Sequence, residues 1–204
     1  EYRNPRTLGE LAVPQALLAS FFQAVTPRTA GFNTLDIGSM TSATLFLLMV
    51  LMFIGAAPGG TGGGIKVTTF GITVAALWAT VRGAQEAVIF KRRLPSELVA
   101  RAFFVSLIAF LAVNGVAALL LITEGRGLLP TLFETISAAG TVGLSTGEGG
   151  APVSLTGHFG AVGKLLISAT MYMGRIGPLT LAVAVARGGT PARVRYPDGK
   201  ILVG

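Results

Sequence analysis

The sequence predicts an all-α polytopic membrane protein built from repeated units of helix, re-entrant loop and helix. Its composition is the first reason: 51% of the 204 residues are hydrophobic, 12% are charged, and the mean hydropathy is +0.70. Soluble domains carry roughly 25% charged residues. Long runs with almost no charge and a six-residue motif that occurs twice are the other two reasons.

Two apolar runs predict membrane-spanning helices. Residues 102–123 contain no charged side chain and belong to a predicted helix over residues 95–123. Residues 165–186 contain only Arg175 and belong to a predicted helix over residues 158–186. Both runs are long enough, because about 20 apolar residues in a helix cross the hydrocarbon core of a bilayer.

A third apolar stretch is interrupted in its middle. Between residues 39 and 81 the only charged side chain is Lys66, but residues 55–64 are rich in glycine and contain Pro58. Relative to Ala, each Gly costs a helix about 1 kcal/mol and Pro about 3 kcal/mol. We therefore expect one spanning element whose two apolar pieces, 44–54 and 65–81, are separated by a loop.

The repeated motif has the pattern Thr-x-Gly-apolar-polar-Thr. Its two copies lie 112 positions apart, Thr29-Ala30-Gly31-Phe32-Asn33-Thr34 and Thr141-Val142-Gly143-Leu144-Ser145-Thr146. Each copy follows a predicted helix too short to span, over residues 11–25 and 128–139. Non-helical backbone at membrane depth is tolerated only where it is buried in protein or lines water. An ordinary glycine turn is the alternative, and the second copy argues against it.

The two copies predict a filter of backbone carbonyls. Glycine permits dihedral angles that turn consecutive carbonyls the same way, and rings of carbonyls replace the water shell of a potassium ion. The side chains of Phe32 and Leu144 are expected to pack away from the ion. The predicted K⁺-binding carbonyls belong to Thr29, Ala30, Gly31, Phe32, Thr141, Val142, Gly143 and Leu144.

Basic residues predict the topology. They collect beside the apolar spans, in one segment with Arg82, Lys91, Arg92 and Arg93 and another with Arg187, Arg193, Arg195 and Lys200. The positive-inside rule places both segments in the cytoplasm, with the C-terminus, and places Asp36, Glu124 and Glu148 on the other side. A nucleic-acid patch is the alternative for a chain of net charge +7, but it needs solvent-facing surface that this chain hardly has.

Three longer motifs carry a family resemblance. They are Thr-Pro-Arg-Thr-Ala-Gly-Phe-Asn-Thr at 26–34, Gly-Gly-Thr-Gly-Gly-Gly-Ile-Lys at 59–66 and Met-Gly-Arg-Ile-Gly-Pro-Leu-Thr at 173–180. With the closing segment 194–201 they resemble the membrane subunit of Ktr/Trk potassium uptake systems, within the Ktr/Trk/HKT superfamily, and the Ktr type most closely. The resemblance covers essentially the whole chain.

The resemblance implies an architecture. Four repeats of outer helix, pore helix, filter and inner helix surround a potassium-channel-like pore in that family, and this chain corresponds to most of the third repeat and the whole fourth. Residues 1–81 then form the third repeat without its outer helix, 82–97 a basic cytoplasmic linker, 98–186 the fourth repeat and 187–204 a cytoplasmic tail. The chain lacks an initiator Met, so we expect a segment of a longer protein.

The resemblance also implies a function and partners. It implies potassium uptake across the cell membrane by a transporter that is not an enzyme and has no covalent cofactor. Transport can depend on sodium in that family. The implied partners are membrane lipid, a second copy in a homodimer and a cytosolic nucleotide-binding regulatory ring, with no nucleic acid. A sodium or mixed-cation transporter of the same superfamily is the alternative.

The glycine-rich stretch is the predicted gate. A phosphate-binding loop is the first alternative, but such a loop has Gly directly before Lys, and here Ile65 separates Gly64 from Lys66. A dinucleotide-binding motif would need a third glycine at the position of Ile65. A membrane-embedded enzyme that uses a phosphate or nucleotide also lacks a nucleophile and base pair. By resemblance the stretch is an intramembrane gating loop; a passive kink is the remaining alternative. The predicted gating residues are Pro58, Gly59, Gly60, Thr61, Gly62, Gly63, Gly64, Lys66 and Arg175.

Arg175 is expected to complete the barrier. A cation near the middle of a spanning helix costs about 2.5–3.5 kcal/mol on insertion scales, so it needs partners. No carboxylate is close in the sequence, and the carbonyls freed around residues 59–64 are the expected partners. A structural Arg bound away from the pore is the alternative. Lys66 is expected to line the cytoplasmic vestibule or to extend toward the interface.

Overall fold

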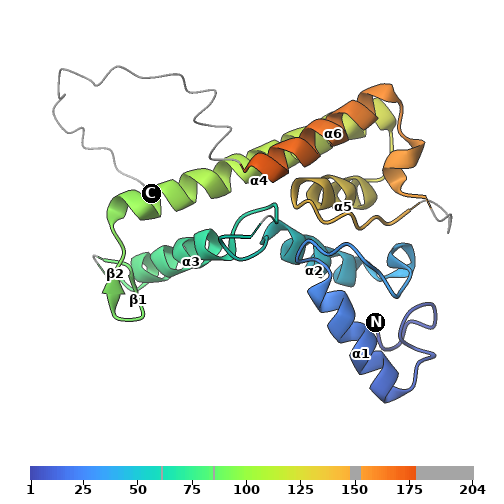
Figure 1. Ribbon diagram of the computed structural model, residues 1–204, viewed down its shortest axis with the longest axis horizontal. Coiled ribbons are helices and arrows are strands. Elements are labelled where there is room, and N and C mark those ends of the chain that lie inside the picture. The colour runs from blue at the N-terminus through green and yellow to red at the C-terminus, as the bar shows by residue number, and fades with distance from the viewer. Residues whose placement is uncertain (61, 85, 148–152, 178–204) are drawn as a thin grey trace.

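The computed structural model describes residues 1–60, 62–84, 86–147 and 153–177, and it is mainly helical (Figure 1). Six α-helices in this part of the chain account for most of the described residues. They are α1 (Val13–Val25), α2 (Ser42–Phe53), α3 (Val67–Val81), α4 (Ser96–Glu124), α5 (Leu128–Ala139) and α6 (Ala161–Ile176), with short 3₁₀ turns η1 (Ile37–Ser39) and η2 (Leu155–His158).

The long helix α4 organises the packing. It contacts α3 along one half of its length and α5 and α6 along the other (Figure 1). The helix α5 also packs on α2, where Met52 and Phe133 are fully buried in the larger of two apolar clusters. A second cluster joins α4, α5 and α6 around Leu120 and Ile167. The pore helix predicted over residues 128–139 therefore lies at the centre of the described core.

One helix of the described part, α4, is long and apolar enough to cross a membrane by itself. The helix predicted over residues 158–186 is wrong in its bounds. It begins at Ala161, after η2, and ends at Ile176 because Gly177 has a φ of +89° that no helix contains. Pro178 follows, and residues 178–186 lie outside the described part of the chain.

The interrupted spanning element has the predicted form. Helix α2 ends at Phe53, α3 begins at Val67, and the described residues between them, 54–60 and 62–66, are not helical. Ile54 and Ile65 form a parallel bridge in which the N–H of Ile65 donates to the carbonyl of Phe53 (3.1 Å). Because the bridge is parallel, the chain leaves the loop in the direction in which it entered. We call residues 54–66 the Gly-rich loop.

A β-hairpin lies within residues 82–97, the segment predicted as a basic linker with no assigned secondary structure. Strands β1 (Val88–Ile89) and β2 (Arg92–Arg93) pair antiparallel, and Arg93 forms an ion pair with Glu86 (3.1 Å). The two turn residues, Phe90 and Lys91, have φ of +49° and +61°, which fits the twist of a two-residue hairpin. Such turns usually contain Asn or Gly, and this one has neither, so no local pattern in the sequence indicated it.

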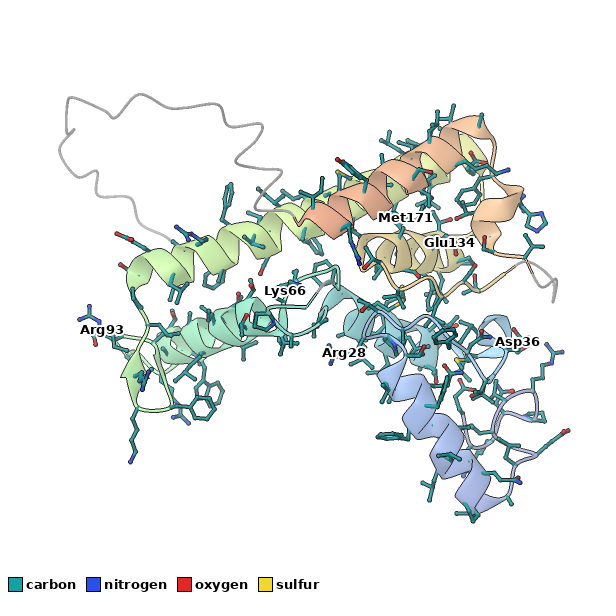
Figure 2. The ribbon with its side chains drawn as sticks, viewed as in Figure 1. Arg28, Asp36, Lys66, Arg93, Glu134 and Met171 are labelled. Carbon is teal, nitrogen blue, oxygen red and sulfur yellow. The ribbon has the colours of Figure 1, made fainter. Side chains whose placement is uncertain are left out.

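The charged ends of the molecule lie far apart. Arg93 in the hairpin and Asp36 beside η1 are at opposite ends of the long axis (Figure 2). The placement of these two ends on different sides of a membrane stays a prediction. The second basic segment, residues 187–200, is outside the described part.

Candidate functional site

The two copies of the repeated motif lie against each other in space. We call residues 29–34 the first Thr-Gly loop and residues 141–146 the second. A Cβ atom added to Gly31 would overlap the carbonyl oxygen of Val142, and one added to Gly38 would overlap that of Thr146. Segments far apart in the sequence thus meet at backbone-to-backbone distance, which requires glycine.

Both loops border one cavity of 620 Å³. Its lining is mainly polar and comes from the last residues of each loop and the segments that follow. The cavity residues are Gly31, Asn33, Thr34, Leu35, Asp36, Ile37, Gly143, Leu144, Ser145, Thr146, Gly147, Val153 and Ser154. A polar, open space of this size next to two non-helical loops is a suitable place for a hydrated cation.

The backbone of both loops is held in the same unusual conformation. Gly31 and Gly143 have φ of +76° and +89°, and Thr29 and Thr141 have φ of +70° and +54°. A β-branched residue with positive φ is a genuine outlier and persists only where the surroundings enforce it. Alternation of left-handed and right-handed residues turns successive carbonyls to one side. The glycine signal was visible in the sequence, and the strained threonines were not.

The second loop is supported by side chains of α5. The N–H of Gly143 donates to Ser137 Oγ (3.2 Å), and the N–H of Leu155 in η2 donates to Ser145 Oγ (2.9 Å). Glu134 accepts from both the N–H (3.0 Å) and the hydroxyl (2.5 Å) of Thr156 through Oε1. The bonds to Ser137 and Glu134 fasten Gly143 of the loop and Thr156 after it to α5, and the bond to Ser145 joins the loop to η2.

Glu134 is a residue that the sequence reasoning missed (Figure 2). It is 6% exposed, and its Oε2 has no hydrogen-bond partner among the described residues. An acidic residue inside the apolar helix 128–139 was the available signal, because ionisable residues at membrane depth are rarely retained without a role.

The first loop has a different set of supports from α1. The hydroxyl of Thr26 donates to the carbonyl of Phe32. With its amide oriented to satisfy both groups, Gln23 accepts through its side-chain oxygen from the N–H groups of Thr34 (3.0 Å) and Leu35 (3.1 Å). Leu144 is buried, at 3% exposure, whereas the equivalent Phe32 is 72% exposed; that both side chains pack away from an ion stays a prediction.

The Gly-rich loop lies directly against the start of both Thr-Gly loops. The N–H of Gly63 donates to Thr141 Oγ1 (2.9 Å), and a Cβ atom on Gly62 would stand 3.0 Å from Thr29 Oγ1. A Cβ atom on Gly55 would overlap the carbonyl oxygen of Gly63. The glycines therefore allow a close approach that larger residues would prevent. Thr61, also predicted in this set, lies outside the described residues.

Two positively charged side chains, Lys66 and Arg28, donate hydrogen bonds to carbonyls of the Gly-rich loop; both are labelled in Figure 2. Lys66 Nζ donates to the carbonyls of Gly60 (3.2 Å) and Gly62 (2.8 Å), so it folds back onto the loop. Arg28, which the sequence reasoning missed, donates through Nη1 to the carbonyls of Ile54 and Gly55 (3.3 Å to the latter). Arg175 is exposed on α6, and its expected contact with these carbonyls stays a prediction.

The cavity is lined by backbone, hydroxyl and amide groups together with the carboxylate of Asp36. Within the described ranges, no group of three or more His, Cys, Asp or Glu side chains is placed to hold a metal ion. Backbone carbonyl and hydroxyl oxygens suit a weakly bound, hard monovalent cation better than a tightly held divalent ion.

Comparisons with known proteins agree with this geometry. Residues 4–189 match the family described as "TrkH: Cation transport protein". The chain is 45% identical to Ktr system potassium uptake protein B of Bacillus subtilis (strain 168) over all of its own length and 44% of that protein's. It is 39% identical to the protein of the same name from Vibrio alginolyticus, again over its whole length, which is 43% of that relative.

Two further matches widen the comparison. The potassium/sodium uptake protein NtpJ of Enterococcus hirae is 36% identical over 99% of this chain and 45% of its own length. The crystal structure of the potassium transporter TrkH from Vibrio parahaemolyticus superposes with a TM-score of 0.74 and 22% identity, covering 88% of this chain and 39% of that one, which shows a shared fold. The chain spans less than half the length of these relatives, and it belongs to the TrkH family of cation transport proteins, which are membrane transporters and not enzymes.

Proposed function

We propose that the complete protein carries potassium into the cell through a filter to which this chain contributes two of four loops. The observation that carries the proposal is the shared backbone conformation of the two Thr-Gly loops beside one polar cavity. The Ktr relatives are named as potassium uptake proteins. Carbonyls of Thr29 to Phe32 and of Thr141 to Leu144 replace the water shell of the ion.

Sodium or mixed-cation transport is the second candidate, since one relative is named as a potassium/sodium uptake protein. Both visible copies of the motif have glycine at the third position, Gly31 and Gly143, which favours potassium. Coupling of transport to sodium belongs to this second candidate as well.

The Gly-rich loop is proposed as the gate. Its residues Gly62 and Gly63 touch Thr29 and Thr141 from the side of α3, so the loop closes the path inward from the filter. An apolar cavity of 60 Å³ borders Gly64 and Ile65 at the end of the loop. Lys66 stabilises the closed shape, and Arg175 adds a positive barrier to cations.

The proposed setting is a multi-pass protein of the cell membrane. Four repeats form the pore, two membrane subunits form a homodimer, and a cytosolic nucleotide-binding ring regulates flux. The hairpin, with Phe90 95% exposed directly before Lys91, Arg92 and Arg93, is a suitable contact for that ring on the cytoplasmic side, together with the C-terminal tail. Deletion of residues 191–204 without loss of complex formation would remove the tail from this proposal.

The test of the filter is ion uptake into liposomes that contain the complete membrane subunit with its regulatory partner. Potassium, rubidium and sodium uptake are compared for wild type, Gly143→Ser and the control Gly71→Ala on α3, where a Cβ atom meets nothing within 4 Å. We expect wild type and the control to pass potassium and rubidium, and Gly143→Ser to lose selectivity against sodium. A wild type that moves neither ion would refute the proposed function.

The gate has a separate test. Arg175→Ala should raise uptake in the absence of the regulatory partner, because it removes the cationic barrier. Unchanged flux together with unchanged dependence on the regulator would leave Arg175 a purely structural residue.

A further inference from the structure

The side chain of Arg28 lies at the C-terminal end of α2. Arg28 directly precedes Thr29 of the first Thr-Gly loop, and its guanidinium reaches across 26 positions of sequence to the carbonyls of Ile54 and Gly55. Those carbonyls follow the last residue of α2, so they carry the partial negative charge of a helix C-terminus. A half-buried cation between a filter and a helix end therefore has a defined electrostatic partner.

The sequence explains why Ile54 needs an outside donor. In a continuing helix the carbonyl of Ile54 would accept from the N–H four residues later. That residue is Pro58, which has no N–H, so continuation of the helix could not supply this bond. An unsatisfied carbonyl at membrane depth is costly, and Arg28 supplies the missing bond.

The residue before the second Thr-Gly loop, Gly140, also lies against the end of α2, and it has no side chain. Gly140 precedes Thr141 as Arg28 precedes Thr29. A Cβ atom on Gly140 would stand 2.8 Å from the carbonyl oxygen of Met52 in the last turn of α2. The end of α2 is thus held from both Thr-Gly loops, by a guanidinium on one side and by close backbone contact on the other.

We infer that Arg28 is a positioning residue that fastens the Gly-rich loop to the first filter loop. By satisfying Ile54 and Gly55 it fixes where α2 stops, and so fixes the Gly-rich loop under Thr29 and Thr141. It also keeps these two carbonyls from binding a cation off the pathway. This inference rests on the proposed function of the Gly-rich loop as the gate.

The experiment measures gate position and transport separately. The complete membrane subunit is prepared with Gly60→Cys as a thiol-labelling site; a Cβ atom there has only an ordinary 3.6 Å contact, and residues 1–204 contain no other cysteine. Arg28→Met is compared with Arg28→Lys and with the charge-removing control Arg3→Met, an exposed residue. Rubidium uptake is recorded with and without the regulatory partner.

We expect Arg28→Met to label about tenfold faster at position 60 and to raise uptake without the regulator about tenfold, with the rubidium KM unchanged. Arg28→Lys should stay within about twofold of wild type, because it keeps a cationic donor. Arg3→Met should behave as wild type.

Wild-type labelling and wild-type regulator dependence in Arg28→Met, at normal protein levels, would overturn the inference. Where Arg28→Met does not reach the membrane, Arg28→Gln replaces it with the same two outcomes. Failure of the proposed function is distinguishable: wild type would then transport no rubidium, while the labelling rates would still report whether Arg28 holds the loop.

Discussion

The two Thr-Gly loops reach the same backbone conformation with different supports. The second is built into the core: Val142 and Leu144 are buried, and α5 packs on α2, α4 and α6. The first follows α1, which projects from the rest of the described structure and leaves Leu17 and Phe21 exposed (Figure 1). Shared positive φ at Thr and Gly, despite unlike surroundings, indicates that the carbonyl arrangement itself is what both loops have to provide.

The largest expected effect tests the contrast between the two helices before the loops. Phe133 on α5 is 0% exposed, whereas Phe21 on α1, which lies 112 positions earlier like the first motif copy, is 68% exposed. Phe133→Ala should lower the free energy of unfolding by about 3–5 kcal/mol, as for other buried aromatic residues. In the complete protein, Phe21→Ala should cost at least about 2 kcal/mol, because the proposed remaining repeats would cover α1. A cost near zero in detergent unfolding would contradict that fourfold arrangement.

The second prediction concerns the two filter glycines. Both have positive φ, but only Gly31 also faces an atom, the Val142 oxygen that an added Cβ would overlap, whereas Gly143 has nothing within 4 Å. Gly31→Ala should reduce potassium uptake about 100-fold or more, a loss of about 2.7 kcal/mol. Gly143→Ala bears only left-handed strain, about 1–2 kcal/mol. Liposome flux that is equally reduced in both variants would remove this asymmetry.

A third prediction concerns the two hydrogen bonds from Thr156 to Glu134, which support only the second loop. Glu134→Ala removes the acceptor for both donors, and bonds to a charged group contribute about 1.5–3 kcal/mol. We expect potassium selectivity over sodium to fall and unfolding to become easier by about 2 kcal/mol. Phe22 holds the aligned position on α1, so Phe22→Ala serves as the control and should leave selectivity unchanged. Equal selectivity in both variants would argue against a role of these two hydrogen bonds in selectivity.

The smallest expected effect is the acid sensitivity of the segment before α1. The carboxylate of Glu1 accepts a hydrogen bond from the N–H of Thr41, the N-cap residue of α2 (2.7 Å). The carboxylate of Glu124 accepts in the same way from the N–H of Gly160, the N-cap residue of α6 (2.9 Å). Burial alone would raise the pKa of Glu1, but hydrogen bonds from Thr7, Thr44 and Thr41 outweigh it and lower the pKa from 4.5 to about 2.

A lowered pKa means that the carboxylate stabilises the fold above pH 4.5 and that this contribution is lost as the pH falls toward 2. Glu1→Gln should therefore unfold more easily than wild type near neutral pH, and the difference should shrink through that window. A difference that does not depend on pH would assign the effect to packing instead of to the charge.

Local chemistry in the sequence was sufficient for the helix over residues 128–139 and for the break between α2 and α3, but not for the bounds of α6. The prediction of residues 128–139 as a helix agrees with α5, because an apolar segment lies between Gly127 and Gly140. The glycines and Pro58 predicted the opening between α2 and α3 for the same local reason. The predicted K⁺ ligands and the repeat boundaries stay predictions, since they depend on the ion and on the rest of the pore.

Tertiary structure alone decided which of these pieces meet. The bond from Gly63 to Thr141 joins residues 78 positions apart, and that from Arg28 to Ile54 joins residues 26 apart. No local pattern encodes such pairs, because each partner satisfies its own backbone preferences without the other. The sequence by itself determined where the chain must leave helical geometry, and packing around α4 and α5 determined which carbonyls and cations those openings bring together.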